Sequence, residues 1–138
     1  MKRFFINPSD SPTPVSYYSH GLRIGPALYT AGQTARDQGG HLIGVGDVSS
    51  QAAQAFFNLM NVLDGANMKP TDVVRLNIFV RSAADLPAIM NARDQLFNQH
   101  RPALTTCVVE ALAYPEYLLE VEAIAVRDGI STEEVQDA

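Results

Sequence analysis

The sequence predicts an α+β fold in which two helices cover one face of a mixed β-sheet. Two patterns alternate along the 138 residues. Segments that alternate between apolar and polar residues indicate strands, whereas apolar residues repeated three and four positions apart indicate helices. In chain order they give β-β-α-β-α-β-β, which is typical of helices packed on one side of a sheet. The length suits one domain, expected over residues 1–127, followed by a polar tail over residues 128–138.

The first half of the chain supplies two strands and a helix. The expected strands cover residues 15–24 and 27–33. Residues 36–46 are rich in glycine and polar residues, which predicts a loop or a loose hairpin. Asp47 is a plausible N-cap for the helix that follows. The apolar residues of this helix fall on one stripe, formed by Ala52, Ala55, Phe56, Leu59, Val62, Leu63 and Ala66.

The second half supplies a strand, a helix and two more strands. Residues 73–81 indicate a strand that carries on one face Val74, Leu76, Ile78 and Val80. The second helix begins at Ser82 or Asp85, and the last strands cover residues 104–110 and 118–126. Polar and apolar residues are interleaved on the sheet face without helices, which suits a subunit interface that contains pockets.

Charge and composition narrow the class of partner. The formal net charge is −5, whereas a nucleic-acid partner requires a basic face. The N-terminal apolar run is too short for a signal peptide, and no stretch is long enough to span a membrane. Cys107 is the single cysteine, so no intrachain disulfide can form. We therefore expect a cytoplasmic protein with neither a nucleic-acid nor a membrane partner.

The sequence lacks the common metal and nucleotide motifs. Metal-ligand spacing is absent among the three histidines, which are His20, His41 and His100. The glycine-rich run over residues 39–46 lacks the Lys-Ser/Thr of a P-loop. No Gly-x-Ser-x-Gly elbow occurs either. We expect no metal site, and a covalent nucleophile is disfavoured.

Separated segments in a fixed order resemble the RidA/YjgF family. Residues 28–33 read Leu-Tyr-Thr-Ala-Gly-Gln, and residues 102–106 read Pro-Ala-Leu-Thr-Thr. The likeness extends over residues 7–126, which makes it specific. The similar segments, in chain order, are residues 18–21, 28–33, 61–63, 72–80, 102–106 and 118–126.

The resemblance implies a chorismate-mutase-like protomer and a homotrimer with clefts where strands of neighbouring subunits meet. Family members with the full site hydrolyse reactive enamines and imines, such as 2-aminoacrylate, to a ketoacid and ammonia without a cofactor. In those members an arginine of a Pro-Ala-Arg-Ser/Thr motif clamps the substrate carboxylate. Carried onto this sequence, the arginine position is Leu104.

The other site positions of the family fall on residues with suitable chemistry. Glu120 and Tyr18 take the catalytic positions: Glu120 can orient and deprotonate a water molecule, and Tyr18 can hold the water or the leaving nitrogen. Ala31 stands where the archetype has a serine. The implied substrate-binding residues are Ala31, Gly32, Asn91, Leu104 and Thr106.

Leu104 changes what such a cleft can hold. Arginine binds a carboxylate through two charge-assisted hydrogen bonds worth roughly 1.5–3 kcal/mol each, and leucine offers none. We therefore predict weak activity on 2-aminoacrylate. The substrate then lacks a carboxylate, is larger and more apolar, or anchors on another cation such as Arg36 or Arg101.

Strand periodicity adds two expectations about side-chain direction. Leu104 and Thr106 share one face of their strand, so if that face lines the cleft, Cys107 points away into the core. Glu120 and Glu122 share a face roughly 7 Å apart. That pair can serve acid–base chemistry or form an ion-paired strand face. The resemblance favours Glu120 as the cleft residue and a structural role for Glu122.

Three functional hypotheses follow. The leading one is a hydrolytic deaminase that acts on an enamine, an imine or a related small metabolite. Loss of the arginine also fits a non-catalytic small-molecule-binding or regulatory trimer. Ribonuclease activity, which has been attributed to family members, is disfavoured because the chain is acidic and lacks a basic, aromatic groove.

Overall fold

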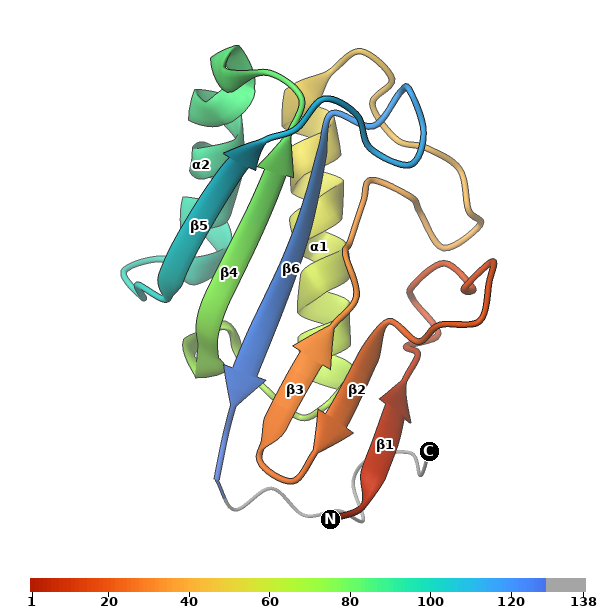
Figure 1. Cartoon of the computed structure of the whole chain (residues 1–138), viewed down its shortest axis with the longest axis vertical. Coiled ribbons are helices and arrows are strands. Elements are labelled where there is room, and N and C mark those ends of the chain that lie inside the picture. Colours follow the sequence, from red (N-terminus) through yellow and green to blue (C-terminus); the bar gives the residue numbers. More distant parts are fainter. Residues whose placement is uncertain (129–138) are drawn as a thin grey trace.

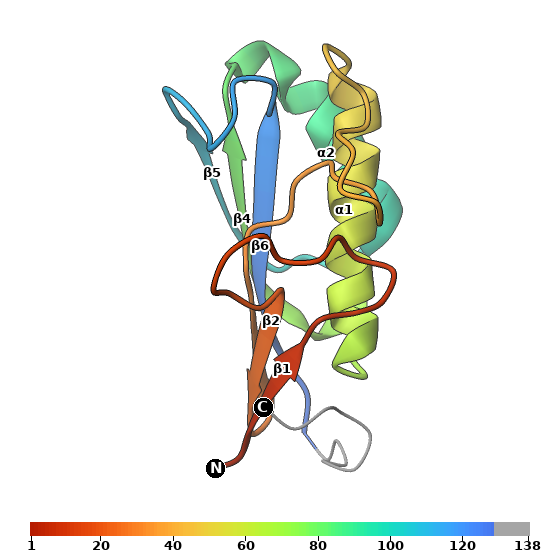
Figure 2. The ribbon, with the colours of Figure 1, turned by 90° about the vertical axis from the view of Figure 1, so that its right-hand side faces the viewer.

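The protein folds as one sheet with two helices packed on a single face. The computed structural model describes residues 1–128, and Figure 1 shows the sheet with its strands in the order β1-β2-β3-β6-β4-β5. Figure 2, a view from the side, shows α1 and α2 together in one layer on one side of the sheet. The strands are β1 (Arg3–Ile6), β2 (Gly21–Ile24), β3 (Ala27–Thr30), β4 (Val73–Val80), β5 (Ala103–Val108) and β6 (Leu119–Val126). The helices are α1 (Val48–Gly65) and α2 (Leu86–Phe97), with two 3₁₀ turns, η1 (Pro70–Asp72) and η2 (Ala83–Asp85).

The predicted α+β architecture is confirmed, with one added strand. β4 and β5 run parallel and all other neighbours are antiparallel, so the sheet is mixed as expected. The added strand, β1, pairs with β2, and it buries Phe4 and Ile6. Burial alternates along its four residues, but three of them are consecutive apolar residues, so the sequence shows no alternating pattern there. The strand predicted over residues 15–24 begins only at Gly21, and the residues before it form a loop.

Helix α1 begins where the sequence predicts and packs its whole apolar stripe. Asp47 caps it, because its carboxylate accepts hydrogen bonds from the backbone N–H and the hydroxyl of Ser50, at 3.3 and 2.8 Å. Every residue of the predicted stripe is at most 3% exposed. Burial of these side chains against the sheet supplies most of the driving force that holds the two layers together.

A β-bulge near the start of β4 corrects one prediction about its faces. The register of β4 against β6 shifts between Val73 and Arg75. Val73 is therefore 1% exposed while Val74 is 48% exposed, so the prediction that Val74 shares a face with Leu76 is wrong. From Leu76 onward the predicted alternation holds. The extra residue of the bulge is the physical reason for the difference, because it reverses the alternation at one point.

The sheet face opposite the helices, here called the open face, carries the polar residues of the central strands. Val121 and Ala123 of β6 point into the core, so Glu120 and Glu122 project from the open face. In the register of β4 and β6, Glu120 lies opposite Phe79 and Glu122 opposite Asn77. Phe5 and Tyr29, at the other end of the sheet, are each 48% exposed.

The side chains of strand β5 point in the opposite directions from those expected from the sequence. Leu104 and Thr106 pair with Leu76 and Ile78 of β4, which are core residues, so they point to the helical side. Thr105 and Cys107 therefore point to the open face, and Cys107 is exposed. The prediction of a core position for Cys107 is wrong, because it rests on the assumption that Leu104 faces the cleft.

Two expectations concern the membrane and the C-terminal tail. Among the residues that the structure describes, no helix is both long and apolar enough to cross a bilayer. The predicted polar tail lies outside the described residues, except for Asp128.

Candidate functional site

Glu120 occupies an unusual place on the open face. It is partly buried beside Gly32, so closely that a Cβ atom added at Gly32 would collide with its carboxylate. Burial raises the pKa of the Glu120 carboxyl, and the nearby charge of Glu122 raises it further. Its carboxylate has neither a hydrogen-bond nor an ion-pair partner within residues 1–128. A half-buried carboxylate with free oxygens and a raised pKa is suited to accept a proton.

Glu122 differs from Glu120 because it already has a partner. The Asn77 amide donates a hydrogen bond of 3.3 Å to its Oε1 atom. This bond anchors Glu122 to the neighbouring strand, which matches the structural role expected for it. The two carboxylates are therefore distinguished by their contacts.

Tyr18 reaches the site from the loop before β2. Its ring packs edge-on against His20, with 5.7 Å between the ring centroids. Burial raises the pKa of the Tyr18 hydroxyl, followed by the electrostatic effects of Tyr117, Glu120 and Tyr114. Because the pKa of this hydroxyl is raised, it stays protonated as a hydrogen-bond donor at neutral pH.

His20 helps to hold the Tyr18 loop in place through hydrogen bonds. Its Nε2 atom lies 2.5 Å from the carbonyl oxygen of Pro12, which can only accept, so Nε2 carries the proton. Its Nδ1 atom then accepts from the Gln33 side-chain amide at 3.3 Å. The His20 carbonyl accepts from the Ala31 N–H at 2.7 Å, which joins the Tyr18 loop to the end of β3. This network fixes the backbone of both segments beside Glu120.

A cavity of about 280 Å³ opens beside these residues. It lies at the edge where the Tyr18 loop, the end of β3 and the loop before β6 meet. The side chains and backbone that surround it belong to Pro12, Thr13, Val15, Tyr18, His20, Gly32, Gln33, Thr34, Arg36, Gly40, Asn58, Tyr114 and Tyr117. Its volume is near the lower end of the range for small-molecule sites.

Arg36 and two tyrosines form one wall of the cavity. The rings of Tyr114 and Tyr117 lie 5.1 Å apart at 58° to each other, and the Arg36 guanidinium lies 5.2 Å from each ring centroid. Arg36 donates from Nε to the Tyr117 hydroxyl at 2.8 Å and from Nη1 to the Gly40 carbonyl at 3.1 Å. The guanidinium is therefore oriented by an aromatic corner and by two hydrogen bonds.

Two buried amides on α1 hold the loops that supply this wall. Gln51 donates to the carbonyls of Gly44 and Glu116, at 3.1 and 2.9 Å, and accepts from the Leu118 N–H at 3.0 Å. Asn58 donates to the carbonyls of Thr34 and Arg36, at 2.8 and 2.7 Å. Polar residues on the buried side of a helix are thus explained by the backbone groups that they satisfy.

Four of the seven sequence-predicted site residues lie together in the structure. Glu120, Tyr18, Ala31 and Gly32 surround one end of β3, although the Ala31 N–H is already bonded to His20. Leu104 and Thr106 do not join them, because they point to the helical side of β5. Asn91 is exposed on α2, also on the helical side of the sheet. The positions of β5 that do share the open face with Glu120 are Ala103, Thr105 and Cys107.

Sequence reasoning missed the wall that Arg36, Tyr114 and Tyr117 form. The sequence suggests Arg36 only as one of two alternative cations, and it singles out neither tyrosine. The contact joins residues 81 positions apart, so no local pattern announces it. Within residues 1–128, no group of three or more His, Cys, Asp or Glu side chains is arranged to hold a metal ion.

Comparison with known proteins gives consistent matches. The family described as endoribonuclease L-PSP matches residues 8–127. A 2-iminobutanoate/2-iminopropanoate deaminase of Dermatophagoides farinae is 32% identical, over 91% of this chain and 96% of that protein. The 3-aminoacrylate deaminase RutC of Acinetobacter baylyi is 29% identical, over 91% and 98%. The crystal structure of Escherichia coli TdcF with bound serine superposes with a TM-score of 0.83 at 26% identity, over 90% of this chain and 98% of that one.

Proposed function

The chain belongs to the RidA/YjgF family, and from that premise we propose that it is a cofactor-free deaminase that hydrolyses an imine or enamine. The observation that carries the proposal is Glu120, a partly buried carboxylate without a hydrogen-bond partner in residues 1–128 and with a pKa raised by burial. It packs against Gly32, which lines a cavity together with Tyr18. Two relatives are named as deaminases of an imine and of an enamine acid, which supports the reaction class.

The proposed reaction needs a water molecule and a base. Glu120 takes a proton from the water as the water oxygen bonds to the carbon of the C=N group, and it passes that proton to the nitrogen. In the resulting carbinolamine Glu120 takes the hydroxyl proton as the C=O bond forms and the C–N bond breaks, and it delivers that proton to the leaving nitrogen, which departs as ammonia. Tyr18 donates a hydrogen bond to the water oxygen or to the leaving nitrogen. The imine and one water thus give one ketone and one ammonia.

We propose that the working form is a homotrimer with the site at a subunit boundary. The open face exposes Phe5 and Tyr29, and a subunit partner would remove these rings from water. Asn91, exposed on α2, can reach a substrate only if it comes from a neighbouring subunit. Light scattering with size exclusion should report three times the monomer mass of 15.0 kDa. A monomer at micromolar concentration would contradict this assembly.

We propose that specificity differs from that of relatives with the arginine. The motif aligns Leu104 with the arginine, and β5 has no basic residue at any of its six positions. A substrate carboxylate bound over β5 would therefore find no cation on that strand. This agrees with a specificity that differs from that of relatives with the arginine. Weak activity on 2-aminoacrylate is the expected consequence.

The experiment that tests the function is a measurement of ammonia and ketone released from a panel of freshly generated imines. The panel should contain acidic, neutral, aromatic and aliphatic examples. Glu120→Gln is the matched variant, because it keeps the shape of the side chain and removes the base. Turnover that disappears in Glu120→Gln, while the oligomer stays intact, would support the proposal. Equal turnover by both proteins would refute it.

The lack of a basic residue on β5 favours a second candidate, a non-catalytic trimer that binds a small molecule in the same clefts. Calorimetric binding of a metabolite without release of product would distinguish this candidate from the enzyme.

A further inference from the structure

Arg36 is a positively charged side chain on the wall of the 280 Å³ cavity. It forms no ion pair with any carboxylate in residues 1–128, and its two hydrogen bonds go to a tyrosine hydroxyl and a backbone carbonyl. These bonds use two of the five N–H groups of the guanidinium. Three N–H groups remain, among them both on Nη2. A planar cation with this many free donors in a half-buried position matches the needs of a carboxylate ligand.

The surroundings of Arg36 hold it in place before any ligand arrives. One face of the guanidinium rests on the corner formed by Tyr114 and Tyr117, and Nε is bonded to the second of these tyrosines. Asn58, which is 1% exposed, holds the Arg36 backbone carbonyl at 2.7 Å. The side chain therefore has little freedom left to lose when it binds an anion, and such preorganisation increases affinity.

The cavity joins this cation to the proposed catalytic group. Arg36, Tyr18 and Gly32 line the same 280 Å³ space, and Gly32 is the residue that touches the Glu120 carboxylate. The cavity brings Arg36, Tyr18 and the glycine beside Glu120 into one space. A single bound molecule can therefore place an anionic group at Arg36 and a reacting carbon at the Gly32 end of the cavity.

We propose that Arg36 anchors the anionic group of the substrate, and that the substrate is a carboxylate-bearing imine longer than 2-aminoacrylate with an apolar body against the tyrosines. This inference rests on the proposed deaminase function. In this arrangement Arg36, from a different segment of the chain, takes the role of the arginine that β5 lacks.

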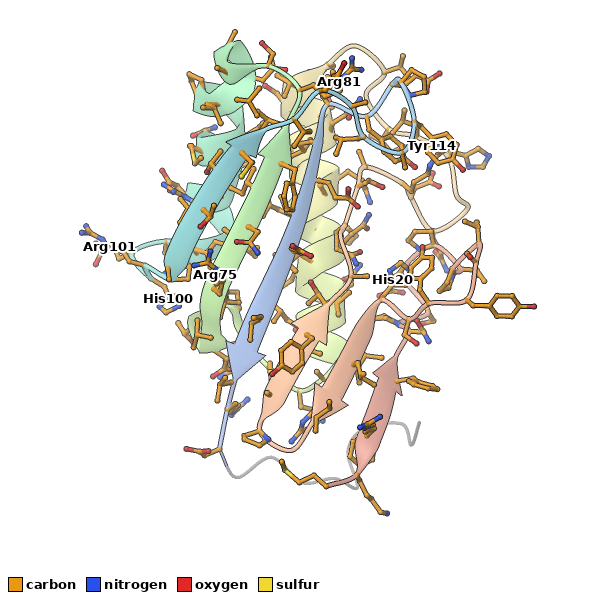
Figure 3. The ribbon with its side chains drawn as sticks, in the orientation of Figure 1. His20, Arg75, Arg81, His100, Arg101 and Tyr114 are labelled. Atoms are coloured by element: carbon orange, nitrogen blue, oxygen red, sulfur yellow. The ribbon has the colours of Figure 1, made fainter. Side chains whose placement is uncertain are left out.

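Two other arginines, Arg75 and Arg101, are less suitable. Arg101 lines a different cavity together with Leu104, on the far side of β4 and β6 from His20 and Tyr114 (Figure 3). Arg75 lies on the open face, and its Nη2 donates to the Thr105 hydroxyl at 2.5 Å. Figure 3 places it, too, across β6 from Tyr114. Neither Arg75 nor Arg101 is among the residues that line the 280 Å³ cavity of Tyr18 and Gly32.

Binding of two stable probes to the full chain tests the proposal without any need for turnover. The probes are 3-phenylpropanoate and its amide, which have the same shape and differ in charge. We expect calorimetry to show at least a tenfold preference of the wild-type protein for the acid. Arg36→Met, which keeps the length and removes the charge, should lose this preference, whereas Arg75→Met should keep it. Thermal melting checks that each variant is folded, and Arg36→Lys, with one charge but no fork, should retain part of the preference.

The outcomes separate this proposal from the proposed function. A wild-type protein that shows no preference for the acid overturns the anchor, as does a preference that survives Arg36→Met or disappears in Arg75→Met. If Glu120-dependent turnover is found but the anchor fails, the deaminase proposal stands alone. If the acid binds in an Arg36-dependent manner and no imine is turned over, the anchor stands and the deaminase proposal fails.

Discussion

Gly32 and Glu120 are packed so closely that the absence of a side chain at one fixes the position of the carboxylate at the other. The nearest atoms to a Cβ placed on Gly32 are all from the Glu120 side chain. The backbone of Gly32 has no positive φ, so the glycine is required by this contact and not by its conformation. Gly32 thus contributes to the site by leaving room for the Glu120 carboxylate.

Gly32→Ala should therefore reduce turnover with little loss of stability. The added methyl group displaces the Glu120 carboxylate, and a misplacement of about 1 Å can lower a rate about 100-fold. The free end of a glutamate side chain can move, so we expect a near-normal melting temperature. Steady-state kinetics and thermal melting measure the two effects. Normal kcat in Gly32→Ala would show that the position of Glu120 is not critical.

The Glu120 carboxyl should govern the acidic limb of the rate profile. Its raised pKa, caused first by burial and then by Glu122, places the loss of activity at a higher pH than an ordinary glutamate would. Glu122→Gln removes the smaller of the two causes and should move the limb of kcat/KM part of the way to lower pH. An unchanged limb in this variant would show that another group limits the rate.

Glu120→Gln should stabilise the fold at neutral pH while it abolishes turnover. The folded-state pKa lies above the unfolded one, so the native state binds the proton more tightly. The stability from this group is complete below the unfolded pKa and is lost as pH rises through the folded pKa. The side-chain amide of the Glu120→Gln variant does not ionise, so the variant avoids that loss of stability. We expect a higher melting temperature than wild type at pH 7 and no difference at acidic pH, and the reverse pattern would contradict the assigned direction of the shift.

Sequence reasoning was sufficient for the layers and failed where a single residue sets direction. The α1 stripe and the β6 alternation each span several turns or pairs, so the architecture could be predicted from them. The bulge at Val74 and the direction of Leu104 each depend on one step of register, which a strand pattern does not encode. Contacts such as that of Arg36 with Tyr117 join loops that are held to α1 by hydrogen bonds, so they depend on the tertiary structure.

Gln51→Ala should test how much the hydrogen bonds between α1 and the loops contribute to the free energy of unfolding. The variant leaves two carbonyls and one N–H, all in partly buried hydrogen bonds, without their partner, and an unsatisfied buried group costs about 1–3 kcal/mol. Urea unfolding should therefore show a free energy of unfolding lower by about 2 kcal/mol or more. Gln95→Ala, at an exposed position of α2, is the matched control and should change it by less than about 0.5 kcal/mol. Similar values for both variants would mean that the loops are held by other contacts.

The direction of β5 leads to a test in which activity is gained. Thr105 points to the face that carries Glu120, whereas Leu104 points to the helical side. Thr105→Arg should therefore raise kcat/KM for 2-aminoacrylate at least about tenfold. One charge-assisted hydrogen bond is worth about 1.5–3 kcal/mol, and about 1.4 kcal/mol corresponds to a factor of ten.

Leu104→Arg is the matched control for this gain, because it adds the same group one residue away and on the other face. It should leave kcat/KM near the wild-type value. Arg75 bonds to the Thr105 hydroxyl and would repel a second guanidinium, so Thr105→Arg is also measured with Arg75→Met. A larger gain from Leu104→Arg than from Thr105→Arg would show that Leu104 faces the substrate after all, and that the motif rather than the strand register identifies the arginine position.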